Sequence, residues 1–224
     1  MTQAYQERLK NAPHKTFPVD GRPVFYVCSY GGSGSTMLAK FLSQYGTAYH
    51  IHSRKPPQQL TYPIDARFID NFSDVPVLET ELARCHVIYI FKNPTQSQIS
   101  VYGAHHRVHL EYPNPDNHEL YPPSLREYAL GGKNTLSYGQ HYNNYMCTAD
   151  RNYKIIGVNY HKLWDAGVVH ELFQALKLPA RGINRFPKKR ETKRDPGAQI
   201  VAALNQMNAG LIGLINAAPA LQYY

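Results

Sequence analysis

The sequence predicts a single α/β domain built on a central, mainly parallel β-sheet of about five strands. Three short segments with the composition of buried strands carry this prediction: residues 24–28 (VFYVC), 87–91 (VIYIF) and 153–160 (YKIIGVNY). Each is followed by a stretch that is compatible with a helix, in residues 37–42, 94–102 and 168–176. Strands that alternate with helices are typical of a parallel sheet covered on both faces.

Length and composition agree with a globular domain. The chain has 224 residues, of which 43% are hydrophobic and 18% charged. Residues 1–22 are polar with scattered Pro and Gly, so we expect an N-terminal arm followed by the domain at residues 23–224. The three cysteines, Cys28, Cys85 and Cys147, are widely spaced and form no C-x-x-C pair. We therefore expect neither a disulfide framework nor a zinc ribbon.

Charge favours an anionic partner. Twenty-four Lys and Arg residues against sixteen Asp and Glu give a net charge of +8. This balance suits a nucleotide, a sulfated or phosphorylated ligand, or a nucleic acid. The longest apolar stretch, 211–221, is interrupted by Asn216 and Pro219 and is shorter than the ~20 residues that a membrane span requires. With no apolar signal segment at the N-terminus, we expect a cytoplasmic protein without a membrane span.

A glycine-rich loop, residues 29–36 (SYGGSGST), joins the first predicted strand to the first predicted helix. Such a loop offers backbone N–H groups and the positive end of the helix dipole to a phosphate group. The G-x-x-x-x-G-K-[ST] signature of ATP and GTP hydrolases would need Gly at position 29 and Lys at position 35, where this chain has Ser29 and Ser35. Triphosphate hydrolysis is therefore disfavoured, and a glycine-rich turn without a ligand is the alternative interpretation. The loop residues that could bind phosphate are Gly31, Gly32, Ser33, Gly34, Ser35 and Thr36.

Several segments, in the same order along the chain, resemble the sulfotransferases that use 3′-phosphoadenosine 5′-phosphosulfate (PAPS). Residues 29–36 resemble the family's T-Y-P-K-S-G-T-T loop, which cradles the 5′-phosphosulfate. Residues 90–102 resemble its R-N-P-K-D-V-A-V-S-Y-Y segment, in which the Arg and a Ser eight residues later bind the 3′-phosphate; Lys92 and Ser100 keep that spacing. Four further segments are similar to the family's helix, Y-G-x-W-Y, Y-E-D-L and L-G-L-P elements: residues 124–128, 138–142, 160–163 and 172–179. The resemblance covers residues 24–195.

The resemblance implies a P-loop-like sulfotransferase fold and transfer of a sulfuryl group from PAPS to a hydroxyl or amine acceptor, giving adenosine 3′,5′-bisphosphate (PAP). It implies that residues 31–36 bind the 5′-phosphosulfate, that Lys92 and Ser100 bind the 3′-phosphate, and that Tyr160 contacts adenine. No metal is required. The acceptor would be a small molecule or glycan, and nucleic acid is disfavoured as a partner. Residues 53–75 and 103–123 are expected to line the acceptor pocket, but neither matches a pattern that identifies the acceptor.

The chain departs from the family at several positions. Gly32 stands where the family has a loop lysine, and Lys92, which lacks the bidentate geometry of arginine, stands where it has Arg. Met37 replaces a tryptophan that stacks on adenine. The basic run 188–194 (KKRETKR) stands about where the family has a basic segment over the 3′-phosphate, although a solvated charged face is the other interpretation.

Sulfuryl transfer needs a group that removes the acceptor's proton, and histidine suits this task near neutral pH. Residues 50–57 (HIHSRKPP) resemble the family's K-T-H-L-P segment, which implies His52 as general base and puts His50 where the family has a lysine. Four other residues remain candidates for the base: Glu79, Glu81, His105 and His106. Arg54 or Lys55 could replace the missing loop lysine.

Three other functions stay open at this point. One is a module that binds PAP but has lost catalysis together with the loop lysine. The others are a P-loop nucleotide phosphotransferase and a basic nucleic-acid-binding protein. The sequence does not decide the oligomeric state.

Overall fold

The computed structural model describes residues 21–64, 71–103, 122–148, 150–190 and 194–224. Most of the predicted N-terminal arm (1–22) and of the predicted acceptor-lining segment 103–123 lies outside the described residues. The candidate bases His105 and His106, and residues 191–193 of the basic run, also lie outside them.

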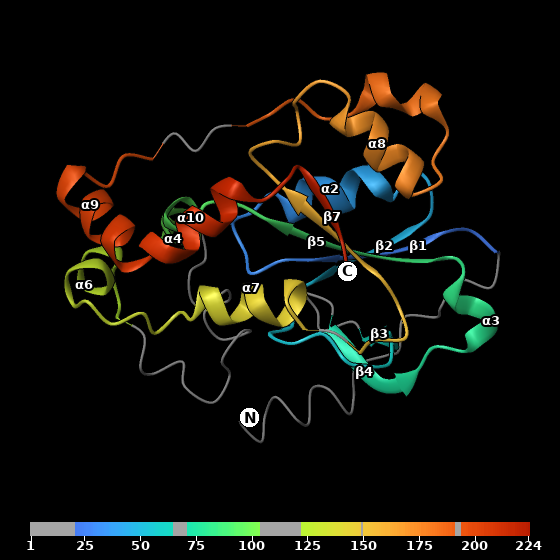
Figure 1. Ribbon diagram of the computed structural model, residues 1–224, viewed down its shortest axis with the longest axis horizontal. Coiled ribbons are helices and arrows are strands. Elements are labelled where there is room, and N and C mark those ends of the chain that lie inside the picture. The colour runs from blue at the N-terminus through green and yellow to red at the C-terminus, as the bar shows by residue number, and fades with distance from the viewer. Residues whose placement is uncertain (1–20, 65–70, 104–121, 149, 191–193) are drawn as a thin grey trace.

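The core of the fold is a five-stranded sheet with the order β2-β1-β5-β6-β7 (Figure 1). Its strands are β1 (Val24–Cys28), β2 (Thr47–Ile51), β5 (Cys85–Phe91), β6 (Ile155–Asn159) and β7 (Leu221–Tyr223). The first four are parallel to one another, and β7 pairs antiparallel with β6. The prediction of an α/β fold with a central, mainly parallel sheet is confirmed.

Both faces of the central strands are buried, which is why β1 and β6 contain apolar residues without polar alternation. Tyr26 of β1 points into one core layer, and its neighbours Phe25 and Val27 point into the other. Two separate hydrophobic layers therefore sandwich the sheet.

Helices cover one of these layers. They are α2 (Ser35–Leu42), α8 (Val168–Ala175) and the 3-10 helix η2 (Ala180–Arg185). The other layer is covered by α7 (Tyr138–Met146) and by a second sheet, in which β3 (Thr61–Ile64) pairs antiparallel with β4 (Asn71–Pro76). Figure 1 shows α2 and α8 on the opposite side of the central sheet from α7 and β3–β4.

The remaining helices lie at the two ends of the sheet (Figure 1). The short helix α3 (Glu79–Leu82) precedes β5, and at the far end lie α4 (Pro94–Gly103), α6 (Leu125–Leu130), α9 (Ala198–Met207) and α10 (Ala209–Ala217). Apolar residues recur at helical spacing from Ile200 to Ile215, but this segment forms two helices because Asn208 interrupts it. The Asn208 Nδ2 donates to Leu204 O at 2.7 Å and to Gln98 Oε1 at 2.9 Å. Among the described residues no single helix is long and apolar enough to cross a membrane, and α9 with α10 reaches that length only as a pair bent by 79°.

The topology determines where a ligand site can form. Strands β1, β2, β5 and β6 are parallel, so their carboxyl ends lie along the same edge of the sheet. The residues that follow these strands are the glycine loop, His52, Lys92 and Tyr160. Residues far apart in the sequence therefore meet at this edge.

Candidate functional site

The backbone of the glycine loop has φ angles that residues other than glycine rarely adopt. Gly31, Gly32 and Gly34 have φ angles of 118°, 65° and 90°. A Cβ atom on Gly34 would lie 2.5 Å from Tyr160 Cε2, and one on Gly32 would lie 2.8 Å from both Ser97 O and Ser100 Cβ. The loop is thus packed between α4 and Tyr160, and it leads into α2 without a side-chain cap, so the first-turn N–H groups of α2 have no side-chain acceptor from the N-cap.

Lys92, directly after β5, has a buried ammonium group. The residue is 5% exposed, and its Nζ donates to Ser100 Oγ at 3.3 Å and lies 5.7 Å from the centre of the Tyr160 ring. Burial lowers the pKa of Lys92 to about 8. Within the described part of the chain no carboxylate forms an ion pair with it. A buried cation without an opposing charge is costly, and a bound anion would offset that cost.

Tyr160 lies between the loop and the segment that follows η2. Its hydroxyl donates to Arg190 O at 2.8 Å, and its ring meets Trp164 edge-on with the ring centres 4.9 Å apart. The same ring contacts Gly34. Tyr160 therefore supports the loop directly, and its expected contact with adenine stays a prediction.

His52 is almost fully buried and is held by the start of the glycine loop. Its Nδ1 lies 2.6 Å from Ser29 O and 3.2 Å from Ser29 Oγ. Since a carbonyl oxygen only accepts hydrogen bonds, Nδ1 carries the proton, and in the neutral ring Nε2 carries the lone pair. This tautomer is the one that a general base acting through Nε2 needs.

A chain of hydroxyl groups links the end of β1 to β2. Ser29 Oγ donates to Ser35 Oγ at 2.8 Å, and Ser35 Oγ lies 2.6 Å from His50 Nε2. The rings of His50 and His52 are 4.4 Å apart, centre to centre. The two histidines of the 50–52 segment thus both contact the loop residues, one through a backbone carbonyl and one through a hydroxyl.

Two loop hydroxyls predicted to bind phosphate have different environments. Ser33 is fully buried; its Oγ donates to Gly31 O at 3.2 Å and lies 3.3 Å from Ser97 Oγ. Thr36, in the first turn of α2, is exposed. Ser33 therefore fixes the shape of the loop, whereas Thr36 faces outward.

Tyr138, at the start of α7, connects the loop to the end of β5. Its hydroxyl donates to Lys92 O at 3.2 Å and lies 3.4 Å from Ser33 Oγ. The sequence analysis named Tyr138 only as part of residues 138–142, which resemble the Y-G-x-W-Y element. It did not predict the contacts that Tyr138, Ser97 and Ser29 make at the site. Ser97 could have been found from its position one helical turn before Ser100.

Two of the candidate bases, Glu79 and Glu81, lie far from the glycine loop. Glu79 and Glu81 belong to α3, which precedes β5, so they lie at the amino edge of the parallel sheet, whereas the glycine loop lies at the carboxyl edge (Figure 1). Glu81 forms an ion pair with Arg84. The alternative that either glutamate is the base is therefore wrong for a site at the glycine loop.

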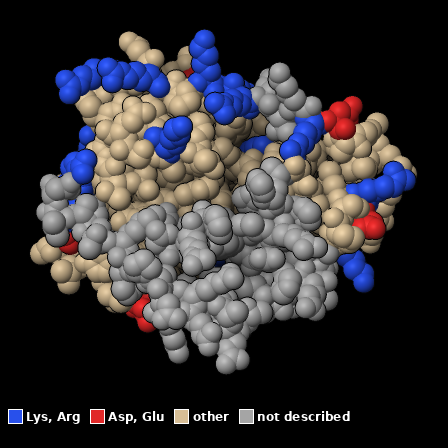
Figure 2. Space-filling view, turned by 180° about the vertical axis from the view of Figure 1, so that it is seen from behind, with Lys and Arg blue, Asp and Glu red and all other residues tan. Residues whose placement is uncertain are grey.

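Basic side chains surround the site from the C-terminal side. Lys189 Nζ donates to His161 O at 3.3 Å, and Arg194 lies against Gly103 at the end of α4, one turn beyond Ser100. Burial and the charges of Lys189 and Lys92 lower the pKa of His161. On the face shown in Figure 2, Lys and Arg side chains are spread over the upper half, while Asp and Glu lie at the margins. Lys92, Lys189 and Arg194 give the surroundings of the site a positive charge, which favours an anion.

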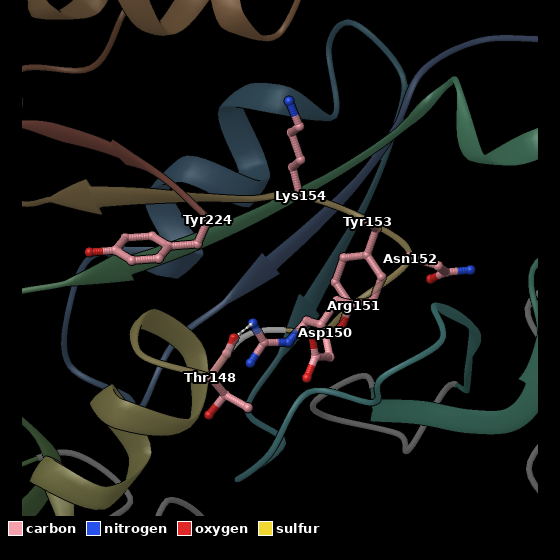
Figure 3. A pocket seen from close by; sticks show the side chains of 7 residues that line it. All are labelled: Thr148, Asp150, Arg151, Asn152, Tyr153, Lys154 and Tyr224. Carbon is pink, nitrogen blue, oxygen red and sulfur yellow. Dashed lines mark hydrogen bonds between the residues drawn. The ribbon is translucent and has the colours of Figure 1, made fainter.

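A separate hollow of about 400 Å³ lies near the amino end of β6 (Figure 3). Its lining residues come from the turn before β6 and from the C-terminus: Thr148, Asp150, Arg151, Asn152, Tyr153, Lys154 and Tyr224. Arg151 donates to the backbone carbonyls of Asn144 and Thr148, so its guanidinium is already engaged. The hollow contains none of the predicted site residues.

The described residues include no group of three His, Cys, Asp or Glu side chains that could hold a metal ion.

Comparisons with known proteins give little further guidance. No protein-family model matches the chain, and no curated protein matches it. The crystal structure of mouse sulfotransferase SULT7A1 complexed with PAP is similar over 93% of this chain and 87% of that chain, with 16% sequence identity and a TM-score of 0.38. Similarity at this level carries no argument about function.

Proposed function

We propose that the chain binds PAPS at the carboxyl edge of its sheet and transfers the sulfuryl group to a hydroxyl or amine of a small-molecule or glycan acceptor, releasing PAP. The observation that carries the proposal is the Lys92–Ser100 pair. It combines a buried ammonium, a hydroxyl within hydrogen-bond distance and, among the described residues, no carboxylate partner. Such a group is suited to bind an anion.

The position of this pair favours a ligand with two anionic groups. Gly32 of the loop packs directly on Ser97 and Ser100, so the loop and the Lys92–Ser100 pair are adjacent. The loop offers backbone N–H groups and the N-terminus of α2, and Lys92 offers a charge. A nucleotide with a 5′-phosphosulfate and a 3′-phosphate presents one anion to each, which ATP does not.

PAPS supplies the activated sulfuryl group when it is bound. The loop backbone and Lys92 would then balance the negative charge that remains on the phosphates. His52 would accept the acceptor's proton at Nε2, because its Nδ1 proton is fixed on Ser29 O. Ser29 therefore sets the tautomer and orientation of the base, and the acceptor would bind next to His52.

A second candidate function is a PAP-binding module without catalysis. Gly32 cannot supply the charge that a loop lysine would bring to the bridging oxygen, and Ser35 is bonded within the protein to Ser29 and His50. This candidate keeps the binding site and loses only the transfer step.

Turnover of 35S-labelled PAPS with sets of phenols, sugars and amines tests the proposal. We expect label on at least one acceptor class and release of PAP, with His52→Asn as the matched inactive control. Tight PAP binding with no transfer to any acceptor would favour the binding module. ATP binding in preference to PAP would contradict both functions.

A further inference from the structure

His50 reaches the glycine loop through a single hydroxyl group. The parallel register of β1 and β2 sets His50 opposite Val27, just before the loop begins. From there its Nε2 lies 2.6 Å from the hydroxyl of Ser35, the first residue of α2. His50 is therefore one hydrogen bond away from the helix end that would face an anion.

The hydrogen bonds of Ser35 depend on where His50 carries its protons. Ser35 accepts a bond from Ser29 and has one proton to donate. When His50 Nε2 carries a lone pair, that proton is given to His50. When Nε2 carries a proton, His50 becomes the donor, and the proton of Ser35 becomes available to an anion in the loop. An anion at the start of α2 thus favours the protonated ring, because the imidazolium also brings a positive charge to a loop that has Gly32 in place of a cation.

We propose that His50 takes up a proton when an anion enters the glycine loop and, acting through Ser35, is a positioning residue for the 5′-phosphate group. The inference rests on the proposed function, since it assumes that a phosphate group binds at this loop. The proton comes from solvent and forms a bond with His50 Nε2. Ser35 keeps its own O–H bond and only redirects it from His50 to the anion.

Among the residues that the structure describes, the titratable groups on the elements packed around His50 are few. His52 is its neighbour on the same segment, and α2, which packs on the same face, carries only the exposed Lys40. Strand β1 has no charged side chain. The exposed Asp74 belongs to β4, which packs on the other face of the sheet, where Phe72 stacks on Tyr26. His52 already has its Nδ1 proton on Ser29 O, so among these groups only His50 contacts the anion-binding helix through a hydroxyl that can reverse its donation.

Lys92 also titrates beside the loop, but at a higher pH than a histidine. The strand order β2-β1-β5 puts His50 on one side of the loop and Lys92 on the other. With a pKa of about 8, Lys92 is already charged in most molecules at pH 7, so anion binding adds few protons to it. Proton uptake by a histidine occurs mainly in the range below pH 7.5. The two contributions can therefore be separated by pH.

Isothermal titration in buffers of different ionisation enthalpy measures the proton uptake. The ligands are PAP and adenosine 5′-monophosphate, because the second has only the 5′-phosphate and so reports on the loop alone. At pH 7.0 we expect wild-type protein to take up roughly 0.3–0.8 proton with either ligand, and its Kd to rise about tenfold from pH 6.0 to pH 7.5. His50→Gln keeps a hydrogen-bonding side chain but cannot titrate, so at pH 7.0 it should take up roughly 0.3–0.8 proton less than wild type and should lack most of the tenfold rise in Kd. The phosphate groups of the ligand, whose second pKa is about 6, contribute equally to both proteins, so the difference reports on His50.

Two further variants complete the test. Ser35→Ala should reduce the uptake as His50→Gln does, and His170→Gln, an exposed histidine on α8, should behave like wild type. If His50→Gln does not fold, 15N spectra of histidine-labelled wild type decide instead: the His50 Nε2 resonance should move into the protonated range when ligand is added.

The outcomes distinguish the inference from the proposed function. Binding of both ligands without proton uptake, or the same uptake in His50→Gln as in wild type, would overturn the role of His50 and leave the nucleotide site intact. No binding of either ligand at any pH would contradict the proposed function and the inference together.

Discussion

Replacing Lys92 with methionine should stabilise the ligand-free protein and abolish its preference for a 3′-phosphate. Methionine has nearly the shape of the lysine stem but no charge. Lys92 is 5% exposed and, within the described residues, pairs with no carboxylate. The substitution therefore removes a buried charge. The Ser100 hydroxyl loses its hydrogen bond to Lys92 but keeps its bond to Gln96 O, so it is not left unpaired.

The pKa of Lys92 gives the size of the stability effect. Burial lowers it from 10.5 to about 8, and each unit corresponds to about 1.4 kcal/mol, so holding the ammonium at neutral pH costs the folded state up to about 3 kcal/mol. The folded pKa is the lower one, so between about pH 8 and 10.5 the unfolded chain binds more protons than the folded chain, and wild-type stability rises with pH there. The advantage of Lys92→Met is thus largest below pH 8 and disappears near pH 10.5.

The binding effect has the opposite sign. Loss of one charge-assisted contact costs about 1.5–3 kcal/mol, which corresponds to about a 10- to 150-fold weaker Kd for PAP. Adenosine 5′-monophosphate, which lacks the 3′-phosphate, should bind the variant nearly as well as it binds wild type. In wild type, the affinity for PAP should fall as pH rises through about 8, because Lys92 then loses its charge.

Urea unfolding at pH 7 and pH 10, together with titration of the two nucleotides, measures these effects. Lys40→Met, at an exposed lysine in the last turn of α2, is the matched control and should change neither stability nor binding noticeably. If Lys92→Met is less stable than wild type at pH 7 and weakens both nucleotides equally, the reasoning about the buried ammonium is wrong.

The other predictions concern the loop and the base. Gly34→Ala should weaken PAP binding at least about tenfold, because its Cβ would meet the Tyr160 ring at 2.5 Å. Gly132→Ala, at a φ of +67° in open space, carries the backbone strain alone and should leave binding unchanged; equal losses in both variants would refute the packing argument. His52→Asn should lower turnover by about 10²–10⁴-fold with PAP affinity within a few-fold, and normal turnover in this variant would exclude His52 as the base. Glu81→Gln should leave turnover unchanged because Glu81 lies at the opposite edge of the sheet, and a large loss would show that the site has been misplaced.

The parts of the fold that were predictable are those set by local sequence. Strand β1 was predicted at its observed bounds, and the helix after Lys92 nearly so, because a continuous apolar run followed by a glycine or proline break is a strong local signal. Strand β2 (TAYHI) was not predicted, because an edge strand with half-exposed residues has no such run. Strand β7 has only three residues and forms through pairing with the distant β6. Strand β3 contains Pro63, which argues against a strand when the sequence is considered alone.

The candidate site, like the fold, has parts that local sequence predicts and parts that depend on pairing between distant strands. The pairing of Lys92 with Ser100 was implied by the resemblance to the sulfotransferases, and residues eight apart across a strand end and a helix can meet without long-range information. The link from His50 to Ser35 could not be predicted, because it depends on β2 pairing beside β1. The exclusion of Glu81 likewise required knowing the direction of β5.

Direct titration of wild-type protein with PAP and with ATP at pH 7 tests the central claim, a site for a nucleotide that carries both a 3′- and a 5′-anion. A loop that fits the 5′-group beside a buried Lys92–Ser100 pair predicts that PAP binds at least about tenfold more tightly than ATP. ATP binding as tight as or tighter than PAP, or no binding of PAP, would contradict the account.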